Sequence, residues 1–389
     1  MTKAKIGVFG LWRGMEYVRQ FHKREDIEVW AVCDKMESRL QDAVAVCGPD
    51  VKQFTEYEDL LNSGIDAVFI SNYFPDHAAA AIRAMEKGIH VISECTAAPT
   101  LAECVALCET VERTGCKYML AENYPYMAGH MEMANLCQSG VLGRVLYAEA
   151  EYNHTGDRKE LERLTPSPKH WRAYMPRTYY LTHTLGPLMA ITGQMPVQVS
   201  AFAVHSYVLE QYDDFRHNYD ALAMMQCITD DGALFRVSGC TAMCSKSGTR
   251  ICGEAGCAET GRTLGGDVNL YFHPWTTPEG MHQNSTYTPE NKGEGGHGGS
   301  DYWVAKNFAD YLLRDVEPFF NVYRACAMSA VGILAWRSCL ENGKTYAIPD
   351  FKDPAQRDAI RHDDLTPFPG ETTEPTLPCA VRAQNKNAN

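Results

Sequence analysis

The sequence of 389 residues has no apolar run long enough to cross a membrane. Stretches such as DAVFISN reach only strand length, whereas a membrane helix needs roughly 20 residues. The first residues, MTKAKIGVFG, lack the basic segment, the long apolar run and the small-residue cleavage site of a secretion signal. We therefore expect a cytoplasmic protein without a membrane partner.

Positive charge is also scarce. The 36 lysines and arginines are outnumbered by 49 acidic residues, which gives a formal net charge of −13. No basic run offsets this charge locally. Such a chain repels polyanions, so nucleic acid is not an expected partner.

The cysteines lack the spacing of a metal site or of a disulfide framework. There are 15 of them, an odd number, scattered along the chain. The closer groupings are Cys104 with Cys108, Cys240 with Cys244, and Cys252 with Cys257. Because these groupings have neither a CxxC spacing nor a neighbouring histidine, we expect reduced thiols and no metal site.

Short apolar runs alternate with amphipathic helical stretches over the first 123 residues. The runs are nearly continuously apolar, as parallel strands covered on both faces should be. They lie at residues 5–10, 27–34, 66–72, 90–94 and 117–123. This βαβ pattern predicts an α/β chain with an N-terminal Rossmann domain over residues 1–124.

The pattern changes after a helix expected near residues 127–139. Extended segments separated by turns follow at residues 145–154, 197–206, 221–231 and 233–240. They predict a C-terminal α+β domain over residues 125–389, with an open, mostly antiparallel sheet. Residues 259–300 are rich in Gly, Thr, Asn and Pro, and we expect long loops near a site there.

The first strand leads into GVFGLWRG, residues 7–14, which is similar to a dinucleotide-binding loop. Gly10 can form the tight turn, and Gly14 lets the following helix approach a pyrophosphate. Trp12 and Arg13 belong to the same expected cofactor-binding loop, although Trp12 departs from GxGxxG. The alternative interpretation is an ordinary turn between a strand and a helix.

Asp34 ends the second strand, at the distance downstream where a carboxylate binds the adenosine ribose. A carboxylate there disfavours a 2′-phosphate, so we expect NAD rather than NADP. The alternative role for Asp34 is a helix N-cap.

From residue 64 onward the sequence resembles the glucose-fructose oxidoreductase, inositol dehydrogenase and rhizopine catabolism (Gfo/Idh/MocA) family. The segment GIDAVFISNYFPDHAAAAIRAMEKGIHVISE is similar to the family's strand, Pro-Asp-His turn, Ala-rich helix and next strand. The resemblance implies that Asn72 and His77 line the dinucleotide, and that Glu94 follows the next strand beside it.

Two departures from the family pattern are informative. Where its dehydrogenases have Glu-Lys-Pro, this chain has Glu94-Cys95-Thr96, so the lysine that helps to deprotonate the substrate hydroxyl is absent. Tyr179 stands four residues before His183, where the family usually has an Asp. We interpret Cys95 as a small neighbour of the cofactor and not as a nucleophile.

These departures resemble one branch of the family, the NAD-dependent glycoside hydrolases typified by α-N-acetylgalactosaminidases. Similar segments are ECTAAPTLAEC, AENYPYM with Asn123 and Tyr126, AEAEYNH with Glu149, the pair Trp171-Arg172, YLTHTLGP with Tyr180 and His183, and HGGSD with His297 and Asp301. Packing alone does not require polar residues at these separate places, so this set of segments is specific evidence for the resemblance to that branch.

The resemblance implies a redox-assisted hydrolysis with tightly bound, recycled NAD. A ring hydroxyl, generally at C3, is oxidised, a base removes the C2 proton, the C1 group leaves, water adds and the hydride returns. His183 and Tyr180 would be the catalytic acid/base pair, and Glu149 would assist the leaving group or activate water. The implied substrate contacts are Tyr126, Arg172, Tyr179, His297 and Asp301.

Structural alternatives exist for three of these residues. Glu149 would be a solvated strand carboxylate, Arg172 a member of a surface ion pair, and Asp301 a helix cap.

The leading hypothesis is an NAD-dependent glycosidase that acts on a small-molecule glycoside or sugar. The alternatives are an NAD-dependent glycoside or polyol dehydrogenase that leaves a keto-sugar, and a catalytically inactive NAD or sugar sensor. The family resemblance also implies a homo-oligomer. The sequence leaves open the sugar, the aglycone and the anomeric preference.

Overall fold

Two units make up the chain in the computed structural model, which describes residues 3–154, 156–242, 247–260, 268–272, 282–284, 287–291, 293–370 and 372–381. The first unit comprises Met1–Tyr126, Pro289–Cys326 and Phe351–His362, and the second comprises Met127–Thr288, Ala327–Asp350 and Asp363–Asn389. The expected division into residues 1–124 and 125–389 has a single boundary. In the structure, the segments Pro289–Cys326 and Phe351–His362 belong to the same unit as the N-terminal residues.

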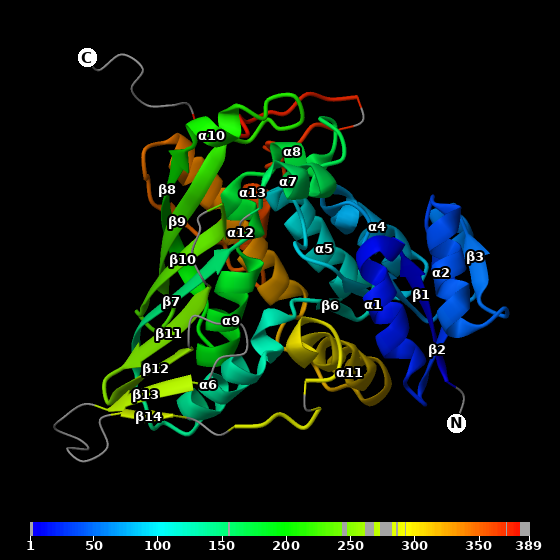
Figure 1. Cartoon of the computed structure of the whole chain (residues 1–389), viewed down its shortest axis with the longest axis horizontal. Coiled ribbons are helices and arrows are strands. Elements are labelled where there is room, and N and C mark those ends of the chain that lie inside the picture. The colour runs from blue at the N-terminus through cyan, green and yellow to red at the C-terminus, as the bar shows by residue number, and fades with distance from the viewer. Residues whose placement is uncertain are drawn as a thin grey trace. The chain divides into compact units, whose positions relative to one another are not determined.

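A six-stranded parallel sheet with the order β3-β2-β1-β4-β5-β6 forms the centre of the first unit (Figure 1). This order is that of the doubly wound fold, in which connections leave β1 in opposite directions. The strands are β1 (Ala4–Phe9), β2 (Ile27–Cys33), β3 (Lys52–Phe54), β4 (Ala67–Ile70), β5 (His90–Ser93) and β6 (Tyr118–Leu120). The predicted Rossmann fold is confirmed, and the sequence missed only β3, whose three residues make no apolar run.

The helices of the first unit include one that comes from far along the sequence. They are α1 (Leu11–His22), α2 (Glu37–Cys47), α3 (Tyr57–Leu61), α4 (His77–Glu86), α5 (Leu101–Thr114), α11 (Ser300–Arg314) and α13 (Pro354–Ile360), with the 3-10 turns η1 (Phe74–Asp76), η2 (Tyr124–Tyr126) and η4 (His297–Gly299). Both α11 and α13 therefore lie outside the predicted N-terminal domain.

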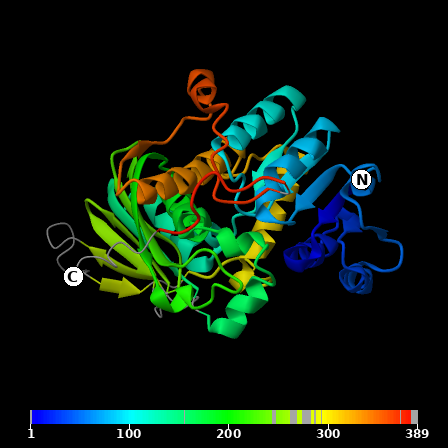
Figure 2. The same cartoon turned by 90° about the horizontal axis from the view of Figure 1, so that it is seen from above.

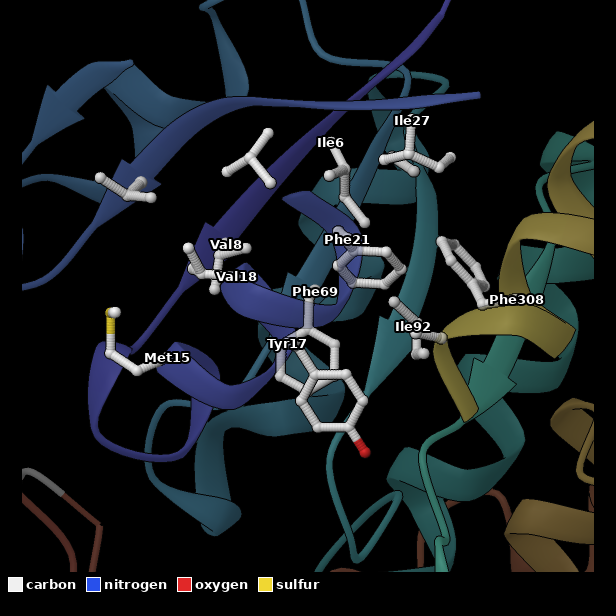
Figure 3. Close-up of a cluster of buried hydrophobic side chains, with 14 of the residues drawn as sticks. Ile6, Val8, Met15, Tyr17, Val18, Phe21, Ile27, Phe69, Ile92 and Phe308 are labelled. Carbon is white, nitrogen blue, oxygen red and sulfur yellow. The ribbon is translucent and has the colours of Figure 1, made fainter. Parts of the chain in front are cut away.

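The core of the first unit includes side chains from α11 (Figure 3). Tyr17 of α1 stacks on Phe69 of β4 with 4.1 Å between ring centroids. Phe21 of α1 meets Phe308 of α11 edge-on at 6.4 Å. Burying each of these side chains contributes about 1.5–3 kcal/mol, so α11 is part of the fold of this unit.

The second unit contains a nine-stranded sheet with the order β14-β13-β12-β11-β7-β10-β9-β8-β15. Its strands are β7 (Val145–Asn153), β8 (Pro196–His205), β9 (Asp220–Thr229), β10 (Leu234–Thr241), β11 (Gly248–Gly253), β12 (Gly256–Thr260), β13 (Val268–Phe272), β14 (His282–Asn284) and β15 (Tyr346–Ala347). Apart from the parallel pair β7 and β10, the pairings are antiparallel. The predicted mostly antiparallel sheet is confirmed.

The predicted long loops at residues 259–300 need a correction. Two strands, β13 and β14, lie within this stretch and extend the sheet. Residues 261–267, 273–281, 285–286 and 292 lie outside the described residues.

Helices lie against one face of this sheet, and Figure 1 shows α6, α9 and α12 on the same side. The helices are α6 (Ala128–Gln138), α7 (Arg158–Leu164), α8 (Trp171–Tyr174), α9 (Thr182–Thr192), α10 (Tyr207–Glu210) and, from Ala327 onward, α12 (Val322–Leu340), with the 3-10 turn η3 (Arg177–Tyr180). On β7, Ala148 and Ala150 are buried. Because side chains alternate along a strand, Tyr147 and Glu149 project from the opposite face.

The turn η3 is held closely between β10 and α12. A Cβ added to Gly239 of β10 would overlap the carbonyl oxygen of Arg177, and one added to Gly332 of α12 would lie 2.8 Å from the carbonyl oxygen of Thr178. These two glycines let the backbone of η3 approach both neighbours. The position of Tyr180, at the end of η3, is fixed as a result.

Across the described residues, every helix is too short or too polar to cross a membrane.

Candidate active site

In the first unit, the predicted dinucleotide loop follows β1 and packs closely against Ser71, the residue after β4. Gly10 has a φ of +85°, and an added Cβ would lie 2.5 Å from the carbonyl oxygen of Ser71. A Cβ added to Gly14 would lie 2.8 Å from Ser71 Oγ. Both positions therefore need glycine. The N-terminus of the 12-residue helix α1 begins directly after Gly10, and Trp12 within this loop is half-exposed.

Asp34 fixes this loop from the end of β2. Its carboxylate accepts hydrogen bonds from the backbone N–H groups of Leu11, at 2.7 Å, and Met36, at 2.9 Å. Helix α2 begins at Glu37 without a side-chain cap, so the alternative of a helix N-cap is wrong. Arg39, which the sequence analysis missed, lies 3.3 Å from the Asp34 carboxylate.

Of three further residues of the expected dinucleotide site, His77 and Asn123 are buried and Asn72 is half-buried. His77 lies 3.2 Å from the carbonyl oxygens of both Asn72 and Thr96, and burial lowers the pKa of His77. The His77 ring thus lies between the loops that follow β4 and β5. The side-chain oxygens Oδ1 of Asn72 and Asn123 are buried and have no hydrogen-bond partner among the described residues.

Arg13 and Asp301 form the centre of a buried network in the first unit. The Arg13 guanidinium donates to both carboxylate oxygens of Asp301, at 2.6 and 3.0 Å, and to Glu94 at 2.9 Å. Asn123 Nδ2 donates to Asp301 at 2.8 Å, and His297 Nδ1 lies 2.9 Å from Asp301. Although burial works to raise the pKa of Asp301, the hydrogen bonds from His297 and Arg13 hold it well below its usual value.

This network changes the expected role of Asp301. Its side chain is fully buried, and both carboxylate oxygens accept hydrogen bonds from the protein, so Asp301 is placed to position its neighbours. It does not cap α11, since the N-cap is Gly299 without a side-chain hydrogen bond. The His297 side chain is 43% exposed, which lets it meet a ligand. Tyr126 is half-buried, and burial raises its pKa to about 12.

Cys95 contacts a buried acid that the sequence analysis did not select. Its thiol lies 3.2 Å from Glu122 Oε2, and its backbone N–H donates to Glu94 at 3.1 Å. Glu122 is fully buried, and its other oxygen accepts from the backbone N–H of Tyr124 at 3.0 Å. A charged residue directly after the apolar strand β6 was the available signal. Cys95 thus stands among acids and not beside a base.

Tyr180 and His183 form a pair in the second unit. The Tyr180 hydroxyl lies 3.4 Å from His183 Nε2. Tyr152 of β7 stacks on the Tyr180 ring, with centroids 5.9 Å apart, and meets the His183 ring edge-on at 5.0 Å. Both rings of the pair are thereby oriented by a third aromatic residue, which the sequence analysis missed.

Glu149 does not join this pair. It projects from the face of β7 opposite to Tyr152, because the two residues are separated by an odd number of positions. Its carboxylate accepts from Tyr147 Oη at 2.6 Å and pairs with Arg236 at 2.6 Å. The predicted role of Glu149, to assist the leaving group or to activate water, stays a prediction, and its side chain, 17% exposed, is not the solvated carboxylate of the alternative.

The two remaining predicted substrate contacts differ in environment. Tyr179 is buried and meets Phe368 edge-on at 5.1 Å, so its ring is part of the core. The Arg172 guanidinium lies over the ring of Trp171, at 4.4 Å, and 5.7 Å from the ring centroid of Tyr180. Arg172 therefore accompanies the pair formed by Tyr180 and His183, whereas Tyr179 does not.

Comparison with known proteins gives two family matches. Residues 4–122 match the Gfo/Idh/MocA model, described as an oxidoreductase family with an NAD-binding Rossmann fold. Residues 276–356 match the C-terminal domain of glycosyl hydrolase 109. The first match covers the N-terminal strands and helices of the Rossmann fold, and the second covers a later part of the chain.

Individual relatives and solved structures are also similar to this chain. A glycosyl hydrolase family 109 protein of Shewanella pealeana is 26% identical, over 90% of this chain and 86% of the relative. Two solved structures share the fold. Levoglucosan dehydrogenase, in complex with NADH and levoglucosan, has a TM-score of 0.76 at 16% identity and covers 90% of this chain and 100% of that one. The aldose-aldose oxidoreductase of Caulobacter crescentus, complexed with glycerol, has a TM-score of 0.72 at 18% identity and covers 89% and 100%.

Proposed function

We propose that this protein is an NAD-dependent glycosidase that oxidises a ring hydroxyl of its substrate transiently and restores it after the glycosidic bond has broken. The observation that carries the proposal is Cys95, whose thiol contacts the buried Glu122 at the position where the family's dehydrogenases have a lysine base. The match to the glycosyl hydrolase 109 C-terminal domain supports the same choice.

The first unit fits a dinucleotide. Gly10 and Gly14 bring the start of α1 close to β4, which is the arrangement that accommodates a pyrophosphate at a helix N-terminus. The unpartnered amide oxygens of Asn72 and Asn123 are acceptors suited to a carboxamide or a ribose hydroxyl. Bound NAD would accept a hydride from a ring carbon and return it later.

Tyr180 and His183 would move the protons. With Tyr180 Oη 3.4 Å from His183 Nε2, one group can take a proton from the sugar while the other replenishes it. Imidazole is suited to this exchange because its ordinary pKa lies near neutral pH. Tyr152 would hold both rings in place. Glu149 is left out of the proposed machinery, because it projects from the other face of the sheet.

The test follows aglycone release and the absorbance of reduced nicotinamide together, on a panel of α- and β-glycosides with added NAD. We expect release of the aglycone at catalytic NAD without lasting NADH. Stoichiometric NADH without aglycone would show the alternative dehydrogenase, and binding of NAD without turnover on any sugar would show a sensor.

Substitutions of single residues test which side chains carry out the proton transfers. Tyr180→Phe and His183→Asn should each lower turnover by about 10²–10⁴-fold, the usual contribution of a general acid or base. Glu149→Gln should leave turnover close to that of the unchanged chain. A large loss in Glu149→Gln with little effect in His183→Asn would contradict the proposed machinery.

A further inference from the structure

Three arginines of the second unit come together beside Tyr180. Arg172 lies on α8, Arg177 on η3, and Arg216 in the segment before β9. The backbone joins two of these segments, since the carbonyl oxygen of Ala173 accepts from the N–H groups of both His217 and Asn218 at 2.8 Å. The chain therefore places Arg172 and Arg216 on adjoining segments.

The third arginine is tied to the same region. Arg177 Nε donates to the carbonyl oxygen of Asp220 at 2.6 Å, and Arg216 Nε approaches the carbonyl oxygen of Asn218 at 3.3 Å. Both side chains are 95% buried, with exposed fractions of 5%. All three guanidinium groups are near enough to the Cys240 thiol to work against the rise of its pKa that burial causes.

Within the part of the chain that the structure describes, these three arginines lack a carboxylate counter-ion. Other arginines with little exposure have carboxylate partners, as Arg337 has Asp363 and Arg357 has Glu112. Among the described residues, Arg172, Arg177 and Arg216 have no carboxylate within 4.0 Å of the guanidinium. The alternative that assigned Arg172 to a surface ion pair is therefore wrong.

The nearest acid does not compensate for them. The Asp220 carboxylate accepts from Asn218 Nδ2 at 3.0 Å and from the N–H of Val381 at 3.3 Å. Burial raises the pKa of Asp220 to about 6. Burial, and then the neighbouring charges of Arg177 and Arg172, lower the pKa of Arg216 to about 9. The lowered pKa of Arg216 is the direction that burial and like charge produce, and an anion beside the cluster would oppose it.

Two donors of the cluster also lack acceptors. Arg172 Nε and Arg177 Nη2 are buried and have no hydrogen-bond partner among the described residues. Buried polar groups in folded proteins are almost always paired. An unpaired guanidinium N–H on each of two neighbouring arginines is the arrangement that a carboxylate, sulfate or phosphate satisfies through two oxygens.

We propose that Arg172, Arg177 and Arg216 bind a negatively charged substituent of the sugar, so that the substrate is an acidic glycoside. The inference rests on the proposed function in one respect: Arg172 lies 5.7 Å from the ring centroid of Tyr180, a member of the proposed acid/base pair. A carboxylate, a sulfate ester and a phosphate ester share the chemistry that this cluster recognises.

The test compares binding within sets of methyl glycosides that differ only at C6. Each set contains the neutral hydroxymethyl sugar, the uronic acid, the 6-sulfate and the 6-phosphate, titrated calorimetrically into the full chain with NAD. We expect at least one anionic member to bind about tenfold or more tightly than its neutral counterpart, as a charge-assisted pair would give. If no anionic sugar binds more tightly than its neutral counterpart, the inference is wrong.

A variant locates the preference without disturbing the most buried groups. Arg172→Gln removes the charge of the least buried of the three arginines and should abolish most of the preference for the anion, whereas Arg172→Lys should keep part of it. The control is Arg163→Gln, whose side chain is 57% exposed and pairs with Glu160. If Arg172→Gln keeps the full preference, the cluster does not bind the substituent.

Binding and turnover separate the two proposals. Tighter binding of anionic sugars without release of aglycone would support the acidic ligand and reject the glycosidase. Release of aglycone from neutral sugars, together with equal or weaker binding of anionic ones, would support the glycosidase and reject the acidic substrate.

Discussion

Asp301 is the residue at which three segments of the first unit meet: α1 through Arg13, the end of β6 through Asn123, and η4 through His297. A carboxylate removed from water is tolerated only when charges and donors compensate for the lost hydration. Because its pKa is held below the ordinary value, this carboxylate stabilises the fold at pH values above the unfolded pKa of about 3.9. The stabilisation is lost as the pH falls through the folded pKa.

Asp301→Asn should lower the free energy of unfolding by about 3 kcal/mol at neutral pH, because it leaves Arg13 with Glu94 alone as a charged partner. Urea titration measures this loss. The control is Asp310→Asn on the same helix, which removes i,i+4 pairs with Lys306 and Arg314 and should cost less than about 1 kcal/mol. Equal losses in the two variants would show that the network around Asp301 adds no stability.

The sequence identified several residues of the candidate site, but it did not show which distant residues they contact. The run Glu94-Cys95-Thr96 and the pair Tyr180 and His183 are local in the chain, so a resemblance could identify them. Glu122 was missed because its contact with Cys95 spans 27 residues.

At the scale of elements, the alternation of β7 explains why Glu149 was misplaced. The strand pattern shows two faces, yet which face receives the helices depends on packing between distant segments. Tyr152 lies on the helix side and meets His183, whereas Glu149 lies on the other. Strands and long helices were predictable because their apolar spacing is local, while the short β3 carries no such spacing.

Gly239→Ala should displace η3, since the added methyl group would overlap the carbonyl oxygen of Arg177. We expect turnover to fall by tenfold or more, because catalysis is sensitive to misplacements of about 1 Å. Binding of NAD by the first unit should be retained. Fluorescence titration with NAD and the glycosidase assay measure the two effects.

The control for this substitution is Gly156→Ala, because an added Cβ there meets only the Glu160 and Leu161 side chains, at 3.1 Å or more. Full activity in Gly239→Ala would mean that η3 can shift without consequence for Tyr180 and His183.

At the scale of the whole molecule, the sheet of the second unit leaves apolar side chains exposed on the face that carries Glu149. Register places Phe202, Ile228 and Leu234 on this face, with exposed fractions of 61%, 40% and 36%. Ile228 and Leu234 are direct cross-strand neighbours, and exposed apolar side chains gathered on one face are typical of protein interfaces. The homo-oligomer implied by the family stays a prediction, and this face is the surface on which we propose to test it.

Phe202→Asp should weaken self-association by roughly 2 kcal/mol or more, as the loss of a central aromatic side chain does at many interfaces. Light scattering coupled to size exclusion over a range of concentrations measures the molar mass. We expect a multiple of the chain mass for the unchanged protein and a shift toward the monomer in the variant. Val316→Asp, at an exposed residue of the first unit, is the control. A monomeric unchanged protein would reject the interface.

Helix α11 packs in the first unit but is synthesised long after the strands of that unit. Asp301 and Arg13 are 288 positions apart, and no local pattern foretells their pairing. At roughly 5–20 residues per second, a ribosome that has finished Tyr126 needs about ten to thirty-five seconds more to reach Asp301. During that interval the nascent N-terminal segment has its strands but lacks Phe308 for its core and a carboxylate for Arg13, so it is at this stage that the growing chain depends most on chaperones.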